Sequence, residues 1–412
     1  MEEQYKDLFR KIFDAEGEDE VHEVIQKSSF LQDSDNWYPY GGKSKDDRSN
    51  FGTFENQQSN SGAALVEKIT NSIDALLLKV CKQQGIDPKS CCAPRTMEEA
   101  TEKFFGIKRG DIGELTGSER TELARDNIQI VATGEDDRPD LMIYDNGEGQ
   151  HPDNFKNTFL SIANNNKTDI PFVQGKYNMG STGAVAFCGE YRYQLIASKM
   201  DGKVFQKQKE LKQNLFGWTL VRRHILTSEE SRNYGSSWYE YFALKGETIP
   251  QFEIGDLDIG LFGDKKFFTG SFIKLYSYQM PKGARTAIHQ GLYREFNQLL
   301  YKFALPIWLY ENRRDRQHLP RRTIGAYGNH VRINIDEKEV LEAKPIYENI
   351  REKDIGEIKV QVAVFKKGED TQKQTDRRRN FIGAKRNVIY TLNGQVHGSD
   401  GVSFITQAKI RF

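Results

Sequence analysis

A single predicted helix, at about residues 61 to 82, carries polar and apolar side chains on opposite sides. Glu67, Asn71 and Asp74 recur at i, i+4 and i+7. Since each helical residue advances by about 100°, these three side chains share one face. The opposite face is apolar, with Leu65, Ile69, Ile73 and Leu76. We therefore expect one side of the helix to pack on a sheet and the other to line a cleft.

A carboxylate beside an amide on one helix face is suited to phosphoryl transfer. The amide oxygen of Asn71 can bind Mg²⁺, and Glu67 can orient or deprotonate an attacking water. A solvated helix face would show the same pattern, so the interpretation depends on the other motifs of the chain.

A second motif, Asp145-Asn146-Gly147-Glu148-Gly149, follows an apolar strand predicted at residues 141 to 144. A carboxylate at this point can accept a hydrogen bond from a buried ligand amine, and glycines allow a backbone to approach closely. The same residues after a strand also form ordinary turns. Because Pro152 suits the first turn of a helix, we predict a helix at residues 152 to 162 and a strand–loop–helix unit.

A third motif is the glycine-rich segment Gly175-Lys176-Tyr177-Asn178-Met179-Gly180-Ser181-Thr182-Gly183, which leads into an apolar run at residues 184 to 187. Free backbone N–H groups in such a segment can bind phosphate oxygens, and Lys176 adds a positive charge. The segment matches neither a Walker A loop nor GxGxxG, so by itself it indicates little.

Taken in this order, the motifs resemble those of the GHKL ATPases, the superfamily of gyrase B subunits, ninety-kilodalton heat-shock chaperones, histidine kinases and MutL. The resemblance covers the N box, Glu67-x-x-x-Asn71-x-x-Asp74-Ala75, the adenine box, Asp145-x-Gly147-x-Gly149, and the lid box at Gly180 to Gly183. Gly270-Ser271 before a predicted strand is similar to the last box, where Gly-Thr is more usual.

The resemblance implies an α+β fold. Residues 61 to 282 would form a two-layer α/β sandwich, the Bergerat ATP-binding fold, with an insertion at about residues 83 to 126. Residues 1 to 60 would form an N-terminal helix and arm, and residues 283 to 412 a smaller, transducer-like α/β domain. That domain offers two alternative candidates for a lysine that contacts the γ-phosphate, Lys385 and Lys409.

The resemblance also implies ATP and Mg²⁺ as cofactors. Glu67 would be the general base, Asn71 the Mg²⁺ ligand and Asp145 the acceptor for the adenine amine. Asp74 would support the helix or reach the adenine side through water. The other residues expected at the nucleotide are Gly147, Gly149, Lys176, Asn178, Met179, Gly180, Ser181, Thr182, Gly183 and Ser271.

The function that the resemblance implies is ATP hydrolysis that drives lid closure and homodimerisation. A MutL-like or MORC-like ATPase in DNA repair or bacterial anti-phage defence is one hypothesis, and the polar arm at residues 33 to 60 would pack on a second copy. A chaperone-like switch on protein clients and a GHKL protein kinase are alternatives. Two basic clusters favour DNA, although charge runs also occur in solvated loops: Arg313, Arg314, Arg316, Arg321 and Arg322, and Arg377 to Arg379.

Composition limits the other classes. Lys plus Arg and Asp plus Glu each total 59, so no overall field attracts nucleic acid or a membrane. The charged start and the lack of an apolar run near ~20 residues predict a cytoplasmic protein with no membrane partner. The four cysteines fit a reducing compartment, and their spacing does not favour zinc: Cys81, Cys91, Cys92 and Cys188.

Overall fold

The chain divides into two compact units. The computed structural model describes residues 2–42, 47–58, 60–134, 137–162, 167–175, 182–208, 210–281, 287–335, 337–354, 356–366, 380–381 and 388–401. The first unit comprises Met1–Glu295 and Ala304–Ala326, and the second comprises Phe296–Phe303 and Tyr327–Phe412. Two strands beyond residue 283 therefore belong to the first unit, β9 and β10.

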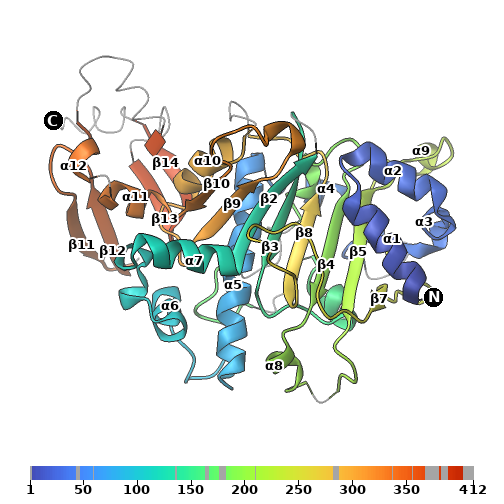
Figure 1. Ribbon diagram of the computed structural model, residues 1–412, viewed down its shortest axis with the longest axis horizontal. Coiled ribbons are helices and arrows are strands. Elements are labelled where there is room, and N and C mark those ends of the chain that lie inside the picture. Colours follow the sequence, from blue (N-terminus) through green and yellow to red (C-terminus); the bar gives the residue numbers. More distant parts are fainter. Residues whose placement is uncertain are drawn as a thin grey trace. The chain divides into compact units, whose positions relative to one another are not determined.

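Among the described residues, ten strands of the first unit form one mixed sheet (Figure 1). Their order is β1-β6-β5-β4-β8-β3-β2-β9-β10, and β7 pairs with β5. The β2–β9 pair is parallel, whereas β2 and β3, β3 and β8, and β8 and β4 are antiparallel. The strands are β1 Trp37–Pro39, β2 Ile128–Gly134, β3 Pro139–Asp145, β4 Gln194–Lys199, β5 Phe216–Arg223, β6 Tyr239–Phe242, β7 Gln251–Phe252, β8 Gly270–Leu275, β9 Ile307–Glu311 and β10 Thr323–Ala326.

Helix α5, Ser61–Gln83, packs against the face of the sheet that carries Asp145. Asn60 caps its start, since the Asn60 Oδ1 accepts hydrogen bonds from the N–H groups of Gly62, at 2.7 Å, and Ala63. The apolar residues predicted for one side of this helix are all buried. Its predicted extent of residues 61 to 82 is confirmed to within one residue.

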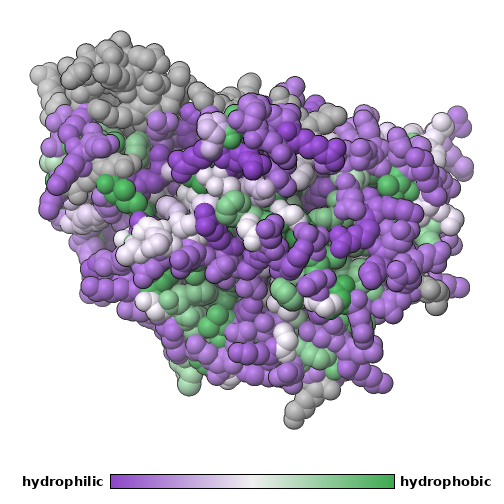
Figure 2. All heavy atoms as spheres, viewed as in Figure 1, coloured by the Kyte–Doolittle hydropathy of each residue, from purple (hydrophilic) through white to green (hydrophobic). Residues whose placement is uncertain are grey.

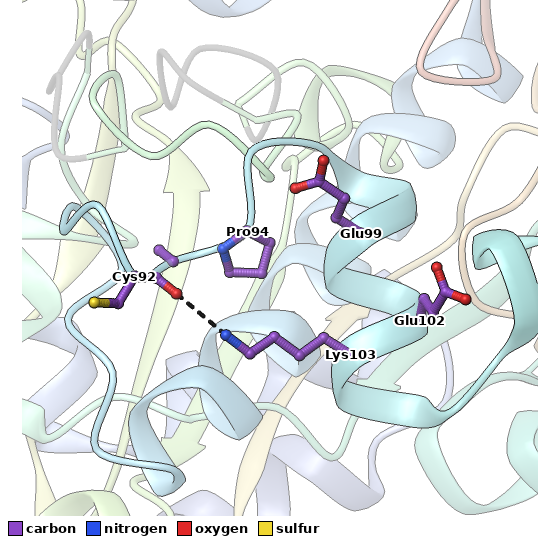
Figure 3. A pocket seen from close by; sticks show the side chains of 6 residues that line it. Cys92, Pro94, Glu99, Glu102 and Lys103 are labelled. Carbon is purple, nitrogen blue, oxygen red and sulfur yellow. Dashed lines mark hydrogen bonds between the residues drawn. The ribbon is translucent and has the colours of Figure 1, made fainter.

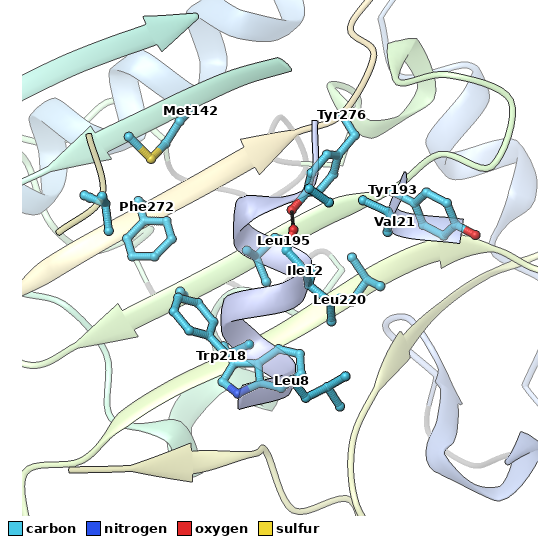
Figure 4. Packing of buried hydrophobic residues seen from close by; sticks show 14 of the residues in the cluster. Leu8, Ile12, Val21, Met142, Tyr193, Leu195, Trp218, Leu220, Phe272 and Tyr276 are labelled. Atoms are coloured by element: carbon cyan, nitrogen blue, oxygen red, sulfur yellow. Dashed lines mark hydrogen bonds between the residues drawn. The ribbon is translucent and has the colours of Figure 1, made fainter. Parts of the chain in front are cut away.

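The opposite face of the sheet is covered by α1, Glu2–Asp14, and α2, Glu18–Lys27. Phe9 and Ile12 of α1 are fully buried in one aromatic-rich core with Trp218 and Phe272 of the sheet (Figure 4). The expected two-layer sandwich is therefore corrected to helices on both faces. The physical reason is that β4, β5 and β8 carry large apolar side chains on this face as well, and these need a cover.

The segment at residues 33 to 60, expected to be too polar to fold on its own domain, also packs in the first unit. Strand β1 pairs with β6, and Phe54 of α4, Phe51–Glu55, stacks on Tyr239 with ring centroids 4.1 Å apart. The Asn50 amide donates hydrogen bonds to the carbonyls of Tyr40 and Tyr239. The expectation was wrong because it weighed the polar residues and not the aromatic ones, which are buried: Trp37, Tyr38, Tyr40 and Phe54.

The remaining elements of the first unit are short. The insertion contains α6, Met97–Phe105, and α7, Gly117–Asn127, and α7 begins with a capping box between Thr116 and Glu119. The helix predicted at residues 152 to 162 is a 3₁₀ segment, η4, at Pro152–Asn157. The other helical segments are α3 Ser29–Gln32, η1 Ser34–Asn36, η2 Lys108–Gly110, η3 Ile112–Glu114, η5 Val185–Phe187, α8 Gly202–Phe205, α9 Glu230–Asn233 and η6 Arg314–Arg316.

The second unit combines short helices with two antiparallel hairpins. Residues 331 to 335 belong to helix α11, although apolar side chains at 331, 333 and 335 would equally suit a strand. Ile333 of α11 packs with Val340, Leu341 and Phe381 in a small core. The elements are α11 Asn329–Ile335, α12 Glu337–Val340, β11 Ile346–Glu352, β12 Gly356–Val362, β13 Val388–Leu392 and β14 Gln395–Asp400, and α10, Gly291–Leu299, spans the division between the units.

The surface seen in Figure 2 is mainly hydrophilic, with apolar residues in small separate groups. Charged residues make up 29% of the chain, which accounts for this appearance. Within the described part of the chain, no helix combines the length and apolar character needed to cross a membrane.

Candidate functional site

The turn at residues 145 to 149, the predicted adenine box, lies against α5. Asp145 is the last residue of β3, and its Oδ2 accepts a hydrogen bond from the Ser72 hydroxyl at 3.3 Å. The Gly147 N–H donates to Asp145 Oδ1 at 3.0 Å, and the Glu148 N–H donates to the Ala75 carbonyl at 3.1 Å. A Cβ on Gly147 would lie 2.5 Å from the Ala75 Cβ, so the contact requires glycine.

The Asp145 carboxyl is buried, with 8% of the residue exposed. Burial raises its pKa to about 7, because an ion is poorly solvated there. The Gly147 N–H, the Ser72 hydroxyl and the positive charges of Lys79 and Lys167 act in the opposite direction. Asp145 therefore changes charge near neutral pH.

Lys79 and Asp201 also stabilise the turn at residues 145 to 149. The Lys79 ammonium donates hydrogen bonds to the backbone carbonyl and the side-chain oxygen of Asn146, both at 2.9 Å. It also lies 3.6 Å from an oxygen of Asp201, whose other oxygen accepts a hydrogen bond from Gln83. Gly149, at φ +62°, has the Lys199 carbonyl 2.0 Å from any added Cβ. The turn is thus fixed between α5 and the end of β4.

Ser271 lies beside this turn, because it is paired with Asp145 across β8 and β3. Its hydroxyl is 2.9 Å from that of Ser198 on β4. The Ser198 hydroxyl also donates to the Gly270 carbonyl and accepts from the Gln150 N–H, both at 2.8 Å. The sequence did not single out Ser198, because a buried serine in a strand has no recognisable pattern.

Asp74 binds the start of the glycine-rich segment. Its two carboxylate oxygens accept hydrogen bonds from the Gln174 N–H, at 2.9 Å, and from the Gly175 N–H, at 2.8 Å. The Lys167 ammonium lies 3.6 Å from the same carboxylate. Burial raises the pKa of Asp74, and Lys167 with the two N–H groups opposes the rise. This anchoring of a loop start was not foreseen from the sequence.

Glu67 and Asn71 are half-buried on α5. A Cβ on Gly175 would lie 2.3 Å from the Asn71 Oδ1, so the backbone of the glycine-rich segment passes against this amide. At the other end of the segment, Thr182 is buried and Gly183 packs on the side chains of residues 57 and 58. The remaining predicted residues lie outside the described residues: Lys176, Asn178, Met179, Gly180, Ser181, Lys385 and Lys409.

A separate shallow pocket of about 340 Å³ lies in the insertion and contains no predicted nucleotide residue (Figure 3). The Lys103 ammonium donates to the Cys92 carbonyl at 3.1 Å on its wall. Across the described ranges, no group of three His, Cys, Asp or Glu residues is arranged to hold a metal ion. The pocket is lined by Cys92, Ala93, Pro94, Glu99, Glu102 and Lys103.

The first basic cluster is largely engaged in ion pairs. Arg313 is fully buried and donates to both carboxylate oxygens of Glu311, at 2.7 and 2.8 Å. Arg314 lies 3.3 Å from Glu16, and Arg316 lies 3.1 Å from Asp315. These contacts lower the support for a nucleic-acid surface at this cluster. The second cluster, at residues 377 to 379, lies outside the described residues.

No protein-family model matches this chain, and no curated protein matches it. The resemblance to the GHKL ATPases therefore rests on the sequence motifs alone. Two contacts of the structure join the other motifs to α5. The Ser72 hydroxyl donates to Asp145, and the Asp74 carboxylate accepts from the N–H groups at the start of the glycine-rich segment.

Proposed function

We propose that this chain binds Mg-ATP on α5 and hydrolyses it as a GHKL-type ATPase. The observation that carries the proposal is the meeting of separate motifs on one helix. Ser72 and Asp145 are 73 residues apart in the sequence, and Asp74 and Gln174 are 100 apart, yet both pairs are hydrogen-bonded. Unrelated turns and loops that matched the motifs by chance would have no reason to converge in this way.

The residues at the adenine box fit a nucleobase with an exocyclic amine. An ionised carboxylate offers about four acceptor positions, and two of those of Asp145 accept hydrogen bonds from Ser72 and Gly147. Gly147 and Gly149 bring the backbone close without a side chain in the way. A ligand amine would find a desolvated acceptor here, where a hydrogen bond to a charged group is strong.

The phosphate side fits a singly ligated magnesium ion. Mg²⁺ keeps several waters and binds through one or two protein oxygens together with substrate phosphates, so the Asn71 amide oxygen suffices. When bound, the ion would neutralise charge on the phosphates. Glu67 lies one turn before Asn71, about 6 Å away along the helix, which leaves room to hold and deprotonate a water.

Hydrolysis by Glu67 is tested by measuring phosphate release from Mg-ATP together with nucleotide binding. Glu67→Ala should lower the hydrolysis rate by about 100-fold or more and leave ADP affinity within about threefold, because a general base acts mainly in the transition state. Glu122→Ala, an exposed glutamate on α7, is the matched control and should retain activity. Unchanged turnover in Glu67→Ala would reject the role.

We further propose that ATP drives homodimerisation, in the manner of the MutL-like and MORC-like ATPases of DNA repair or anti-phage defence. The support is the resemblance alone, and a chaperone-like switch or a protein kinase would use the same pocket. Sedimentation with Mg²⁺ and a non-hydrolysable ATP analogue should give a dimer, while ADP should not. Deletion of residues 33 to 60 is unsuited to this test, because it would remove β1 and several buried aromatic side chains.

A further inference from the structure

Both oxygens of the buried Asp145 carboxyl are held by donors of different kinds. The Gly147 N–H is fixed by the backbone and can only donate. The Ser72 hydroxyl, buried on α5, can donate or accept, depending on the protonation of Asp145. Whether Asp145 accepts or donates a hydrogen bond toward a ligand therefore depends in part on Ser72.

We propose that Ser72 is a specificity-determining residue, which keeps Asp145 as an acceptor and so selects a nucleobase with an amine over one with a carbonyl at the same position. This inference rests on the proposed nucleotide site. An ionised Asp145 accepts from the amine of adenine and repels a carbonyl oxygen. A protonated Asp145 donates instead, and would accommodate the carbonyl of hypoxanthine or guanine.

The protonation of Asp145 is set by groups on three elements. Lys79 on α5 and Lys167 before the glycine-rich segment favour the carboxylate, as do Ser72 and the Gly147 N–H, while burial opposes it. Each lysine also has a carboxylate of its own, Asp201 for Lys79 and Asp74 for Lys167. Tyr144 precedes Asp145 on β3, and Asp145 helps to raise the pKa of its phenol, so it stays neutral. Base selectivity should consequently rise as the pH rises through neutrality.

The test compares the affinities of ADP and inosine diphosphate by calorimetry between pH 6 and pH 8.5. These ligands differ at the purine C6 position, where the amine of one is the carbonyl of the other, and at the neighbouring N1, which carries a hydrogen only in the inosine base. In the wild-type chain, the preference for ADP should increase with pH. In Ser72→Ala, the preference at pH 7 should fall by roughly three- to tenfold, the worth of an ordinary hydrogen bond, because the Ser72 contact is long at 3.3 Å. The rise in preference should move to higher pH.

Two further variants separate this role from a packing effect. Thr70→Val removes another buried hydroxyl of α5, one that donates only to the Glu67 carbonyl, and should leave the preference unchanged. Ser72→Cys keeps the side-chain size but offers a weak donor, and should lie between wild type and Ser72→Ala. Ser72→Cys also replaces Ser72→Ala in the test if the alanine variant does not fold.

The possible outcomes separate the role of Ser72 in base selectivity from the proposed nucleotide binding itself. If ADP binds but the preference over inosine diphosphate does not change with pH, the role of Ser72 is overturned. The same holds if the preference is equal in wild type, Ser72→Ala and Ser72→Cys. In both cases the proposed nucleotide site remains supported. Failure of the wild-type chain to bind either diphosphate would overturn the proposed function itself.

Discussion

Two buried aspartates, Asp74 on α5 and Asp145 at the end of β3, have different hydrogen-bond partners. Asp74 uses both oxygens to bind backbone N–H groups of the glycine-rich segment, and Lys167 lies beside it. Asp145 binds one backbone N–H and one hydroxyl, at the longer distance of 3.3 Å. The comparison indicates that Asp74 anchors the glycine-rich segment, whereas Asp145 retains acceptor positions that the proposed nucleotide would use.

The largest expected effect that tests this contrast is the pH dependence of stability at Asp145. Its folded pKa, about 7, lies above the ordinary value of 3.8, so the stability it contributes is complete below about pH 4 and is lost as the pH rises to about 7. Asp145→Asn carries no such charge. The free energy of unfolding of this variant, relative to wild type, should therefore rise between pH 4 and pH 7, by up to ~4 kcal/mol.

Urea unfolding followed by tryptophan fluorescence measures this difference. All four tryptophans lie in the first unit, so the signal reports on the unit that contains Asp145: Trp37, Trp218, Trp238 and Trp308. Parallel pH profiles for the two proteins would show that Asp145 is not the buried acid with a raised pKa described above.

The next effect concerns Asp74. Asp74→Ala leaves two partly buried backbone N–H groups without their acceptor and removes the carboxylate beside Lys167, and should lower the free energy of unfolding by about 3 kcal/mol at pH 7. Gln84→Ala, a change at the exposed C-cap of the same helix, should cost less than about 1 kcal/mol. A loss for Asp74→Ala no larger than that of the control would remove the distinction between the two aspartates.

Much of the central fold follows from local sequence. Helix α5 was predictable because its apolar residues repeat at helical spacing and Asn60 supplies a cap. Strands β3 and β8 were predictable because compact apolar runs end at glycines and aspartates. The motifs on them could be ordered along the chain without any tertiary information.

The contacts between motifs could not be predicted in the same way. Whether Ser72 reaches Asp145 depends on the register of β3 against α5, which no local pattern specifies. The sequence did not predict that α1 covers a second face of the sheet, because the amphipathic pattern of a helix does not specify which face it packs on. The capping-box residues Thr116 and Glu119 are a sequence pattern from which the start of α7 could have been predicted.

The most direct test of the nucleotide site is a calorimetric titration of ADP into the wild-type chain and Asp145→Asn at pH 8, where Asp145 is mainly ionised. The wild type should bind one ADP per chain, and Asp145→Asn should bind it at least about tenfold more weakly, since its amide presents a donor as well as an acceptor in a desolvated site. Equal affinity in the two proteins, or no binding by the wild type, would contradict the account.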